Sequence, residues 1–325
     1  AVAAQAAPAA PTAPATPAPL EHVRVAFATP SGGFASPWMA KEAGLFERYG
    51  LDAEVGYVAS GPTMLKAMLA GEVQFGELAA PSSMSAYVEG GDVVWITGAV
   101  NRPVLYVIAA PGVGRLEDLR GRPVGISRVG TTTHTMMKIV LRSAGLDAER
   151  DVQLVQAGGA PELVAALGSG HVDAAILGPP SHLVSLQQGM HELLRIHETG
   201  IRWPMGGSVT TRGYLGAHPE VVRNYLRAYV EAIQILRTDR ERAVDVIAKY
   251  ADTPDRTLAE QSWEAFHDYY TQPPYPEREA MAAVVREELG NTNPRAYDIP
   301  PEEFYDDRPL RELEQSGLIQ QVMAR

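Results

Sequence analysis

Short apolar runs alternate with amphipathic segments along the first two thirds of the chain, where strands and helices are expected in turn. A glycine or a proline stands at most of the boundaries between them and starts or ends a helix there. This alternation is typical of βαβ units and mostly parallel sheets. We expect strands at 23–28, 53–58, 73–78, 123–127, 152–156 and 172–177, helices at 38–48, 62–71, 114–120, 131–144, 161–167 and 179–188, and one further helix that opens at Pro81.

The last third of the chain has a different pattern. After about residue 209, helices are expected in succession, and the first of them carries apolar residues at helical spacing on one side. We expect this helical tail to pack on one half of the molecule and to form no third domain. The expected helices are 219–237, 240–250, 254–270, 276–289 and 301–316.

The chain also contains an internal repeat. GPTMLKAMLAGEVQFGELAAPS at 61–82 aligns without a gap to APELVAALGSGHVDAAILGPPS at 160–181, and GLDAE occurs at 50–54 and again at 145–149. Two copies are too few for a solenoid, so they predict two similar lobes with a cleft between them. We expect an α/β fold of two Rossmann-like lobes joined by a two-segment hinge, with the tail packed on lobe one. Lobe one would span 22–103 plus 208–325, and lobe two 104–207.

Composition excludes several classes of function. The chain has 325 residues and a net charge of −11, and it has no run of lysine or arginine, so nucleic acid is not expected as a partner. It has no cysteine, which removes disulfides, thiolate metal sites and cysteine nucleophiles. The histidines lack metal-ligand spacing, and no catalytic motif is present. We therefore expect no metal, no cofactor, no catalytic residue and no enzymatic activity.

The N-terminal segment is composed almost wholly of alanine, proline and threonine. Because such a segment buries no core, we expect a disordered tether over 1–21. The chain has no initiator methionine, which points to a signal peptide already removed from an exported, periplasmic protein. The tether would also suit a lipid anchor in the membrane, and a plain linker is the alternative.

A ligand is expected beyond the carboxyl ends of the strands, where helix N-termini also point. The segment from Ser127 to His134 is the strongest candidate, because a strand ends, Gly130 gives a turn and a threonine-rich helix begins. Free amides and hydroxyls at that helix terminus would bind an anion, and Arg128 would add positive charge. The alternative is that the threonines only cap the helix.

Four further residues are candidates with structural alternatives. Trp38 and Trp203 flank predicted cleft loops and could sandwich a planar ligand, or they pack in the core. Arg102 lies at a predicted crossing between the lobes and could bind a carboxylate or sulfonate, or it is a surface arginine. His134 could donate to an acidic ligand or serve a structural role.

Several segments together resemble a known family. MAKEAGLFERYGLDAEV, GPTMLKAMLAGEVQFG, LEDLRGRPVGIS, LGSGHVDAAIL and HPEVVRNYLRAYVEAI are similar to solute-binding proteins of the nitrate/sulfonate/taurine type, the NMT1-like family. The resemblance runs from about residue 22 to 270. It implies the type II periplasmic binding fold and ligand contacts from the strand-to-helix loops. With the candidates above, the binding residues would be Ser31, Gly33, Phe34, Ser36, Trp38, Ser60, Gly61, Pro81, Ser82, Arg102, Arg128, Thr131, Thr132, Thr133, His134, Pro179, Ser181 and Trp203.

The resemblance implies capture of a small anionic organic molecule and its delivery to an ABC permease and its ATPase. The loop SGGFAS favours a larger, partly apolar acid over a small inorganic anion, so a sulfonate, carboxylate or aromatic acid is expected, bound by a monomer. One alternative is an enzyme on the same fold that acts on a small cyclic acid or a pyrimidine. The related pyrimidine-phosphate synthases need a cysteine-rich motif, which this chain lacks. A second alternative is a sensor that presents its ligand to a receptor.

Overall fold

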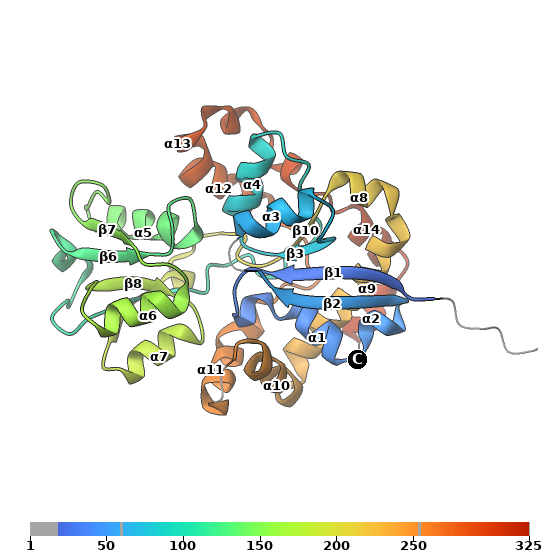
Figure 1. Ribbon diagram of the computed structural model, residues 1–325, viewed down its shortest axis with the longest axis horizontal. Coiled ribbons are helices and arrows are strands. Elements are labelled where there is room, and N and C mark those ends of the chain that lie inside the picture. The colour runs from blue at the N-terminus through green and yellow to red at the C-terminus, as the bar shows by residue number, and fades with distance from the viewer. Residues whose placement is uncertain (1–18, 59–60, 253–254, 325) are drawn as a thin grey trace, which may run out of the picture.

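The computed structural model describes residues 19–58, 61–252 and 255–324. Two five-stranded sheets with flanking helices form two lobes, one on the right and one on the left of Figure 1. Most of the expected tether and the candidate Ser60 lie outside the described residues.

Lobe one is built on a sheet with the strand order β2-β1-β3-β10-β4. The first strand pairs in parallel with β2 and β3, whereas β10 is antiparallel to both β3 and β4. The strands are β1 Glu21–Phe27, β2 Leu51–Tyr57, β3 Phe75–Glu77, β4 Val94–Trp95 and β10 Ser208–Thr210.

Lobe two repeats this plan with the order β7-β6-β8-β5-β9. Strand β6 is parallel to β7 and β8, and β5 is antiparallel to β8 and β9. The strands are β5 Tyr106–Ala109, β6 Pro123–Ile126, β7 Gln153–Gln156, β8 Ala174–Leu177 and β9 His191–Arg195.

The sequence repeat thus reflects a repeated fold. In both copies a helix leads through a glycine into the third parallel strand. Gly71 and Gly170 have φ angles of 80° and 73°, a left-handed conformation that glycine adopts without strain. The prediction of mostly parallel sheets is wrong for β10 and β5, the strands that follow the two crossings between the lobes. These strands and β4 are too short to leave a clear alternating pattern.

The helices of the two lobes follow the predicted positions with one break. The helix expected at 38–48 ends early and restarts, because Gly44 takes a left-handed φ of 66° that a continuous helix excludes. The helices are α1 Ser36–Glu42, α2 Leu45–Arg48, α3 Gly61–Leu69, α4 Ala80–Val88, α5 Thr132–Ser143, α6 Ala160–Gly168, α7 Ser181–Gln187 and α8 Arg212–Ala217, with 3-10 turns at Gly32–Phe34, Leu116–Leu119 and Ile196–Thr199.

The helical tail packs on lobe one, as Figure 1 shows in orange and red. Its longest helix, α9, buries the predicted apolar stripe, including Val222, Leu226 and Ile233, against α1, α2 and β2. The tail elements are α9 Pro219–Thr238, α10 Arg240–Tyr250, α11 Arg256–Phe266, α12 Arg278–Val284, α13 Gly290–Thr292, α14 Arg308–Gln315 and α15 Leu318–Met323, with a π-helical turn at Val285–Leu289 and 3-10 turns at His267–Tyr269, Pro294–Asp298 and Pro301–Phe304.

Two tail predictions need correction. The helix expected at 254–270 begins at Arg256 and gives way to a 3-10 turn after Phe266, and residues 253–254 lie outside the described part. The helix expected at 301–316 is split, because Tyr305 forms a bridge to Trp95 at the edge of the lobe-one sheet. The amide of Asp306 donates to the Trp95 carbonyl at 2.7 Å, a bond to the sheet that interrupts the helix.

Two crossing segments connect the lobes and are hydrogen-bonded to each other. The Val100 amide donates to the Gly206 carbonyl at 2.9 Å, and the Trp203 amide donates to the Asn101 carbonyl at 3.2 Å. A paired double crossing of this kind forms a compact hinge. The lobe boundaries at 103/104 and 207/208 stay predictions. No helix within the described ranges is long and apolar enough to cross a membrane.

Candidate functional site

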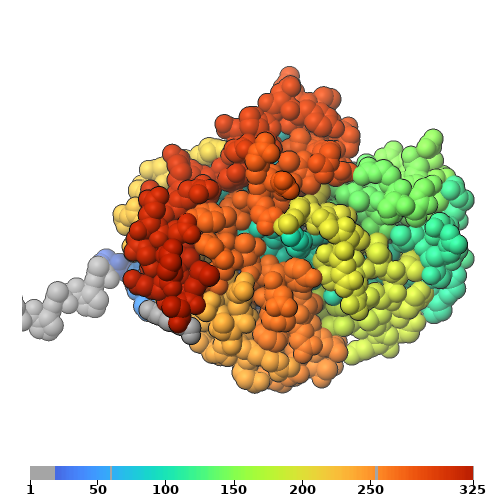
Figure 2. Space-filling model, turned by 180° about the vertical axis from the view of Figure 1, so that it is seen from behind, coloured from blue at the N-terminus to red at the C-terminus, as the bar shows by residue number. Residues whose placement is uncertain are grey.

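Strand-to-helix loops of the two lobes meet between the sheets. Ser31, which follows β1, is buried, and its hydroxyl donates to the carbonyl of Pro179, which follows β8, at 3.0 Å. Seen from behind, the surface is hollowed between the orange tail helices and the yellow segment near residue 200, with teal chain from near residue 100 at its floor (Figure 2). The loops predicted to bind ligand thus lie where the lobes face each other.

The loop after β1 is packed tightly against the tail. A Cβ atom on Gly32 would lie 2.8 Å from the Phe266 ring, and one on Gly33 would lie 3.0 Å from it. The Tyr270 hydroxyl donates to the Gly32 carbonyl at 2.5 Å. From the sequence, this glycine-rich loop was expected to favour a larger, partly apolar acid as the ligand. Phe266 fills the space on one side of the loop, and the preference for a larger acid stays a prediction.

The remaining lobe-one candidates surround this loop. Phe34 and Ser36 are buried directly after it. A Cβ atom on Gly61 would lie 3.0 Å from the Ser82 hydroxyl oxygen, so the loops after β2 and β3 are in contact. Pro81 is buried and Ser82 is partly exposed, which leaves the Ser82 side chain accessible beside Gly61.

The start of α5 has the geometry of an anion site. The hydroxyls of Thr131 and Thr133 bond within the loop, Thr131 to the Arg128 carbonyl at 2.6 Å and Thr133 with the Ser127 hydroxyl at 2.6 Å. Neither hydroxyl caps a helix amide. Among the described residues, the first-turn amides of α5 have no acceptor. These amides therefore remain available to a ligand.

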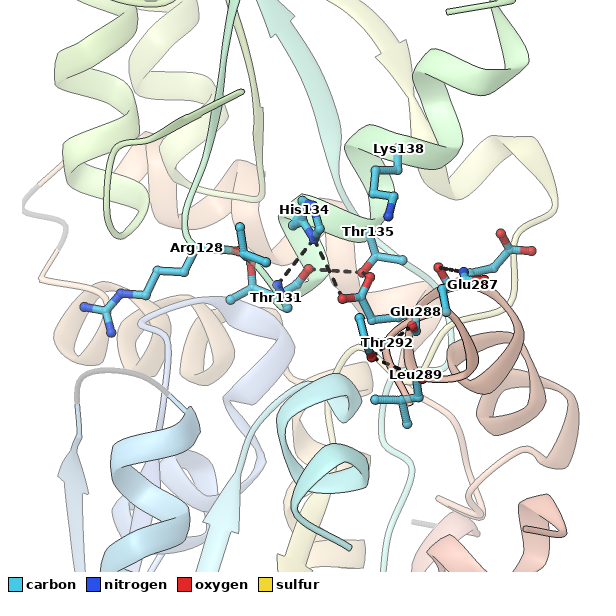
Figure 3. A network of polar contacts seen from close by, with 12 residues as sticks. Arg128, Thr131, His134, Thr135, Lys138, Glu287, Glu288, Leu289 and Thr292 are labelled. Carbon is cyan, nitrogen blue, oxygen red and sulfur yellow. Dashed lines mark hydrogen bonds and ion pairs between the residues drawn. The ribbon is translucent and has the colours of Figure 1, made fainter. Parts of the chain in front are cut away.

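Arg128 does not point into this site. Its side chain is exposed and extends away from His134 and Glu288, as Figure 3 shows. The expected direct contact of Arg128 with an anion at α5 would need a different rotamer. In the present arrangement the positive end of α5 comes from its backbone amides.

His134 is buried one turn into α5 and has two neighbours at the same ring atom. The Gly130 amide donates to His134 Nδ1 at 3.3 Å. A carboxylate oxygen of Glu288 lies 3.7 Å from the same Nδ1 (Figure 3). This carboxylate comes from the π-helical turn of the tail, so the tail of lobe one also contacts lobe two.

Two neighbouring glutamates of the tail make this contact. Glu288 accepts from the Thr135 hydroxyl at 2.7 Å, and both side chains are buried. Glu287 forms an ion pair with Arg142 at 2.5 Å. Burial alone would raise the pKa of Glu288, but hydrogen bonds from His134 and Thr135 outweigh it and hold this pKa below its ordinary value. Glu288 is therefore a buried acidic residue of the tail.

The two tryptophan candidates differ in position. Trp203 is fully buried, and its indole nitrogen donates to the Thr132 hydroxyl at 3.3 Å, which ties the second crossing to the start of α5. Trp38 is also fully buried and stacks on Tyr250 with ring centroids 5.3 Å apart. Trp38 therefore packs in the core of lobe one, the structural alternative that its sequence position left open.

Arg102 is tied to the hinge. Its guanidinium lies 3.7 Å from the Glu277 carboxylate, which also accepts from Arg202 at 3.0 Å. Burial lowers the pKa of Arg102 and the charge of Arg202 adds to this, while Glu277 opposes both. One carboxylate of the tail thus holds an arginine from each crossing.

A cluster of rings lines the lobe-two side near Pro179. Tyr106 stacks on His182 with centroids 4.0 Å apart and meets His197 edge-on at 5.1 Å. His197 in turn contacts Tyr269 of the tail at 5.5 Å, a second contact between the lobes. Burial lowers the pKa of His182 to about 4, so this ring is neutral at physiological pH. Ser181, at the start of α7, is partly exposed next to this cluster.

A buried carboxyl group lies at the end of β3 in lobe one. The Glu77 side chain is fully buried, and one of its oxygens accepts from the Ser208 hydroxyl at 2.5 Å. Burial raises the pKa of Glu77 to about 8, and the hydrogen bond from Ser208 opposes this only in part. Glu77 is therefore largely protonated at neutral pH.

Two surface hollows of about 330 and 420 Å³ lie on lobe one around Arg212, Asp306 and Arg308, outside the interlobe region. Arg308 pairs with Asp306 at 2.5 Å, and Arg212 donates to the backbone carbonyl of Glu303. Because these guanidiniums already have partners, the hollows offer a poorer anion site than the amides of α5.

Comparison with known proteins gives the family. A family model described as NMT1/THI5 like matches residues 33–243, which is more than half of the chain. The chain belongs to the NMT1/THI5-like family. This assignment agrees with the two-lobed fold and with the resemblance of the sequence to the nitrate/sulfonate/taurine group.

Relatives of this family member are named as binding proteins. A binding protein of Brucella abortus (strain 2308) is 25% identical over 232 residues, which cover 70% of this chain and 71% of the relative. An aliphatic sulfonates-binding protein of Escherichia coli (strain K12) is 25% identical over 248 residues, with 74% of each chain covered. Neither of these relatives is named as an enzyme.

Solved structures share the type II periplasmic binding fold with this family member. A protein of Bordetella bronchiseptica RB50 has a TM-score of 0.76 at 20% identity and covers 91% of this chain and 98% of its own. The alkanesulfonate-binding protein of Xanthomonas axonopodis pv. citri, bound to MOPS, has a TM-score of 0.70 at 18% identity, with 86% and 94% covered. The nitrate-binding protein of Synechocystis PCC 6803 has a TM-score of 0.73 at 14% identity, with 91% and 89% covered.

Proposed function

We propose that this chain is an exported solute-binding protein that captures a small organic anion between its lobes. The anion is a sulfonate, a carboxylate or an aromatic acid, and it is delivered to an ABC permease and its ATPase. The protein acts as a monomer in the periplasm, where the N-terminal tether would also allow a lipid anchor.

Two observations carry this proposal: loops from both lobes meet at Ser31 and Pro179, and the start of α5 leaves its first-turn amides without a protein acceptor. The amides of the first turn are free of protein acceptors and lie at the positive end of the helix, which favours an anion. The link between Ser31 and Pro179 holds the loop after β1 against lobe two. Relatives named as binding proteins, one of them for aliphatic sulfonates, support the same function.

Capture would work through the relative stability of the open and closed arrangements. A ligand that contacts both lobes stabilises the closed arrangement by its higher affinity for that state. The permease would then recognise the closed form. The contact of Ser31 with Pro179 crosses between the lobes and would form on closure.

Isothermal titration calorimetry tests this proposal with a panel of alkanesulfonates, aryl sulfonates, aliphatic and aromatic carboxylates, and nitrate. At least one organic acid is expected to bind to one site per chain and to return chemically unchanged. Ser31→Ala, which removes the hydroxyl between the lobes, is expected to weaken that acid about fivefold, the effect of losing one hydrogen bond. Ser169→Ala on the exposed surface of lobe two serves as the control. Binding of none of these anions would refute the proposal.

A further inference from the structure

One ring nitrogen of His134 faces a donor and an acceptor that exclude each other. Nδ1 can accept the Gly130 amide, 3.3 Å away, only when this nitrogen carries no proton. It can donate to Glu288, 3.7 Å away, only when it carries one. Both distances exceed the usual 2.9–3.0 Å of a hydrogen bond, so neither partner is bound closely by Nδ1. Figure 3 shows Glu288 facing His134.

The two protonation states present different surfaces to an anion. With His134 neutral, the Gly130 amide is taken up by the ring and the buried carboxylate of Glu288 lacks a positive partner at that ring. With His134 protonated, Nδ1 donates to Glu288, the carboxylate is neutralised and the Gly130 amide becomes free. Gly130 directly precedes the threonines that begin α5, so its amide would join the first-turn amides. Both changes favour an anion at low pH.

Other charged groups lie around His134 or close to it along the chain. Lys138 lies one turn further along α5 and favours the ionised form of Glu288. The adjacent Glu287 is paired with Arg142. Burial would raise the pKa of Glu287, but the contact with Arg142 outweighs burial and lowers this pKa. Arg128, on the preceding loop, is exposed and points away. Among these groups, His134 is the one whose Nδ1 faces both the Gly130 amide and the Glu288 carboxylate.

We propose that His134 and Glu288 make anion capture at the start of α5 depend on pH, with tighter capture once His134 is protonated. This inference rests on the function proposed above, because it concerns the regulation of the same site. Glu288 acts here as a positioning residue, since it draws the His134 ring away from Gly130 and need not touch the ligand.

The first test uses the ligand-free protein and nuclear magnetic resonance. The ¹⁵N and ¹³C signals of His134, assigned by comparison with His134→Gln, are followed from pH 5 to pH 8.5 together with the Gly130 amide. We expect an unprotonated Nδ1 at high pH and a Gly130 amide that shifts with the same midpoint as the ring. In Glu288→Gln, which keeps an acceptor for Thr135 but removes the negative charge beside Nδ1, the midpoint is expected to differ from that of the native protein.

Glu287→Gln is the matched control. It changes the neighbouring carboxylate, which pairs with Arg142 and not with His134, so the midpoint of His134 should stay nearly the same. The proposal is overturned if the Gly130 amide does not follow His134, or if Glu288→Gln and Glu287→Gln give equal midpoints.

The second test measures capture with methanesulfonate, 1-butanesulfonate and benzenesulfonate, whose charge is constant between pH 5.5 and 8. Any of these that binds should bind about tenfold more weakly at pH 8 than at pH 5.5, as expected from one lost hydrogen bond and one added negative charge. The ratio of the dissociation constants at pH 8 and pH 5.5 should fall to about one in His134→Gln and should stay near tenfold in Glu287→Gln. Binding with no pH dependence overturns this inference and leaves the proposed function standing. If none of the sulfonates binds, the resonance test alone decides the inference, and the calorimetric panel decides the function.

Discussion

Glu77→Gln is expected to flatten the dependence of folding stability on pH. The side chain is fully buried in lobe one, and its Oε1 accepts from Ser208 at 2.5 Å, while the hydroxyl of Tyr225 also contacts Ser208. Burial raises the pKa of Glu77 from 4.5 to about 8. Glutamine has the shape of the protonated acid and keeps an acceptor for Ser208, so the substitution removes the titration and preserves the packing.

The sign and size of the effect follow from the two pKa values. Because the folded-state pKa is the higher one, the native protein binds the proton more tightly than the unfolded chain. The contribution of Glu77 is therefore fully present below about pH 4.5 and is lost as the pH rises through 8. Each pH unit within this window corresponds to about 1.4 kcal/mol. Between pH 5 and pH 8 the stability of the native protein relative to Glu77→Gln should fall by up to about 4 kcal/mol.

Urea unfolding followed by circular dichroism at pH 5, 6, 7 and 8 measures this difference, because all other titrating groups are common to both proteins. Glu72→Gln, at an exposed position shortly before β3, is the control and should follow the native profile. Parallel stability profiles for the native protein and Glu77→Gln would refute the reasoning, since they would mean that Glu77 is ionised or accessible in the folded state.

Two further substitutions test the packing around the hinge. Gly206→Ala would place a Cβ atom 2.3 Å from the Gly33 carbonyl oxygen. Chemical denaturation is expected to show a free energy of unfolding lowered by about 1–3 kcal/mol. The control Gly216→Ala, in open space on α8, should not destabilise the protein. An equal response of the two variants would contradict the close approach. Trp203→Phe removes the donor to Thr132 and should cost about 1 kcal/mol in thermal unfolding, and an unchanged melting temperature would argue against that bond.

Local signals made much of the fold predictable. Each parallel strand and its helix carry their own start and stop residues, such as Gly71 and Gly170 with their left-handed φ angles. The apolar stripe of α9 predicted the buried face of that helix correctly. Four strands, β4, β5, β9 and β10, were not predicted. The two or three residues of β4 and β10 are too few to leave a period in the sequence.

The candidate site was predictable only in part. The loop containing Ser31 and the segment Thr131–His134 were found because ligand loops follow strands in α/β sheets. Glu288 was not found, because it lies 153 residues from its partner Thr135 and sits in a helical segment rich in charged residues. Nothing local distinguishes it from the solvent-exposed glutamates nearby. Its place beside α5 depends on how the tail packs across the whole of lobe one.

Native mass spectrometry of the protein purified from a cell extract tests the central claim of interlobe capture most directly. We expect one small organic anion to be bound per chain, to leave only when the protein is unfolded, and to keep its mass on long incubation. The claim would be contradicted if the candidate acids, once added, either failed to bind to the folded chain or came back chemically altered.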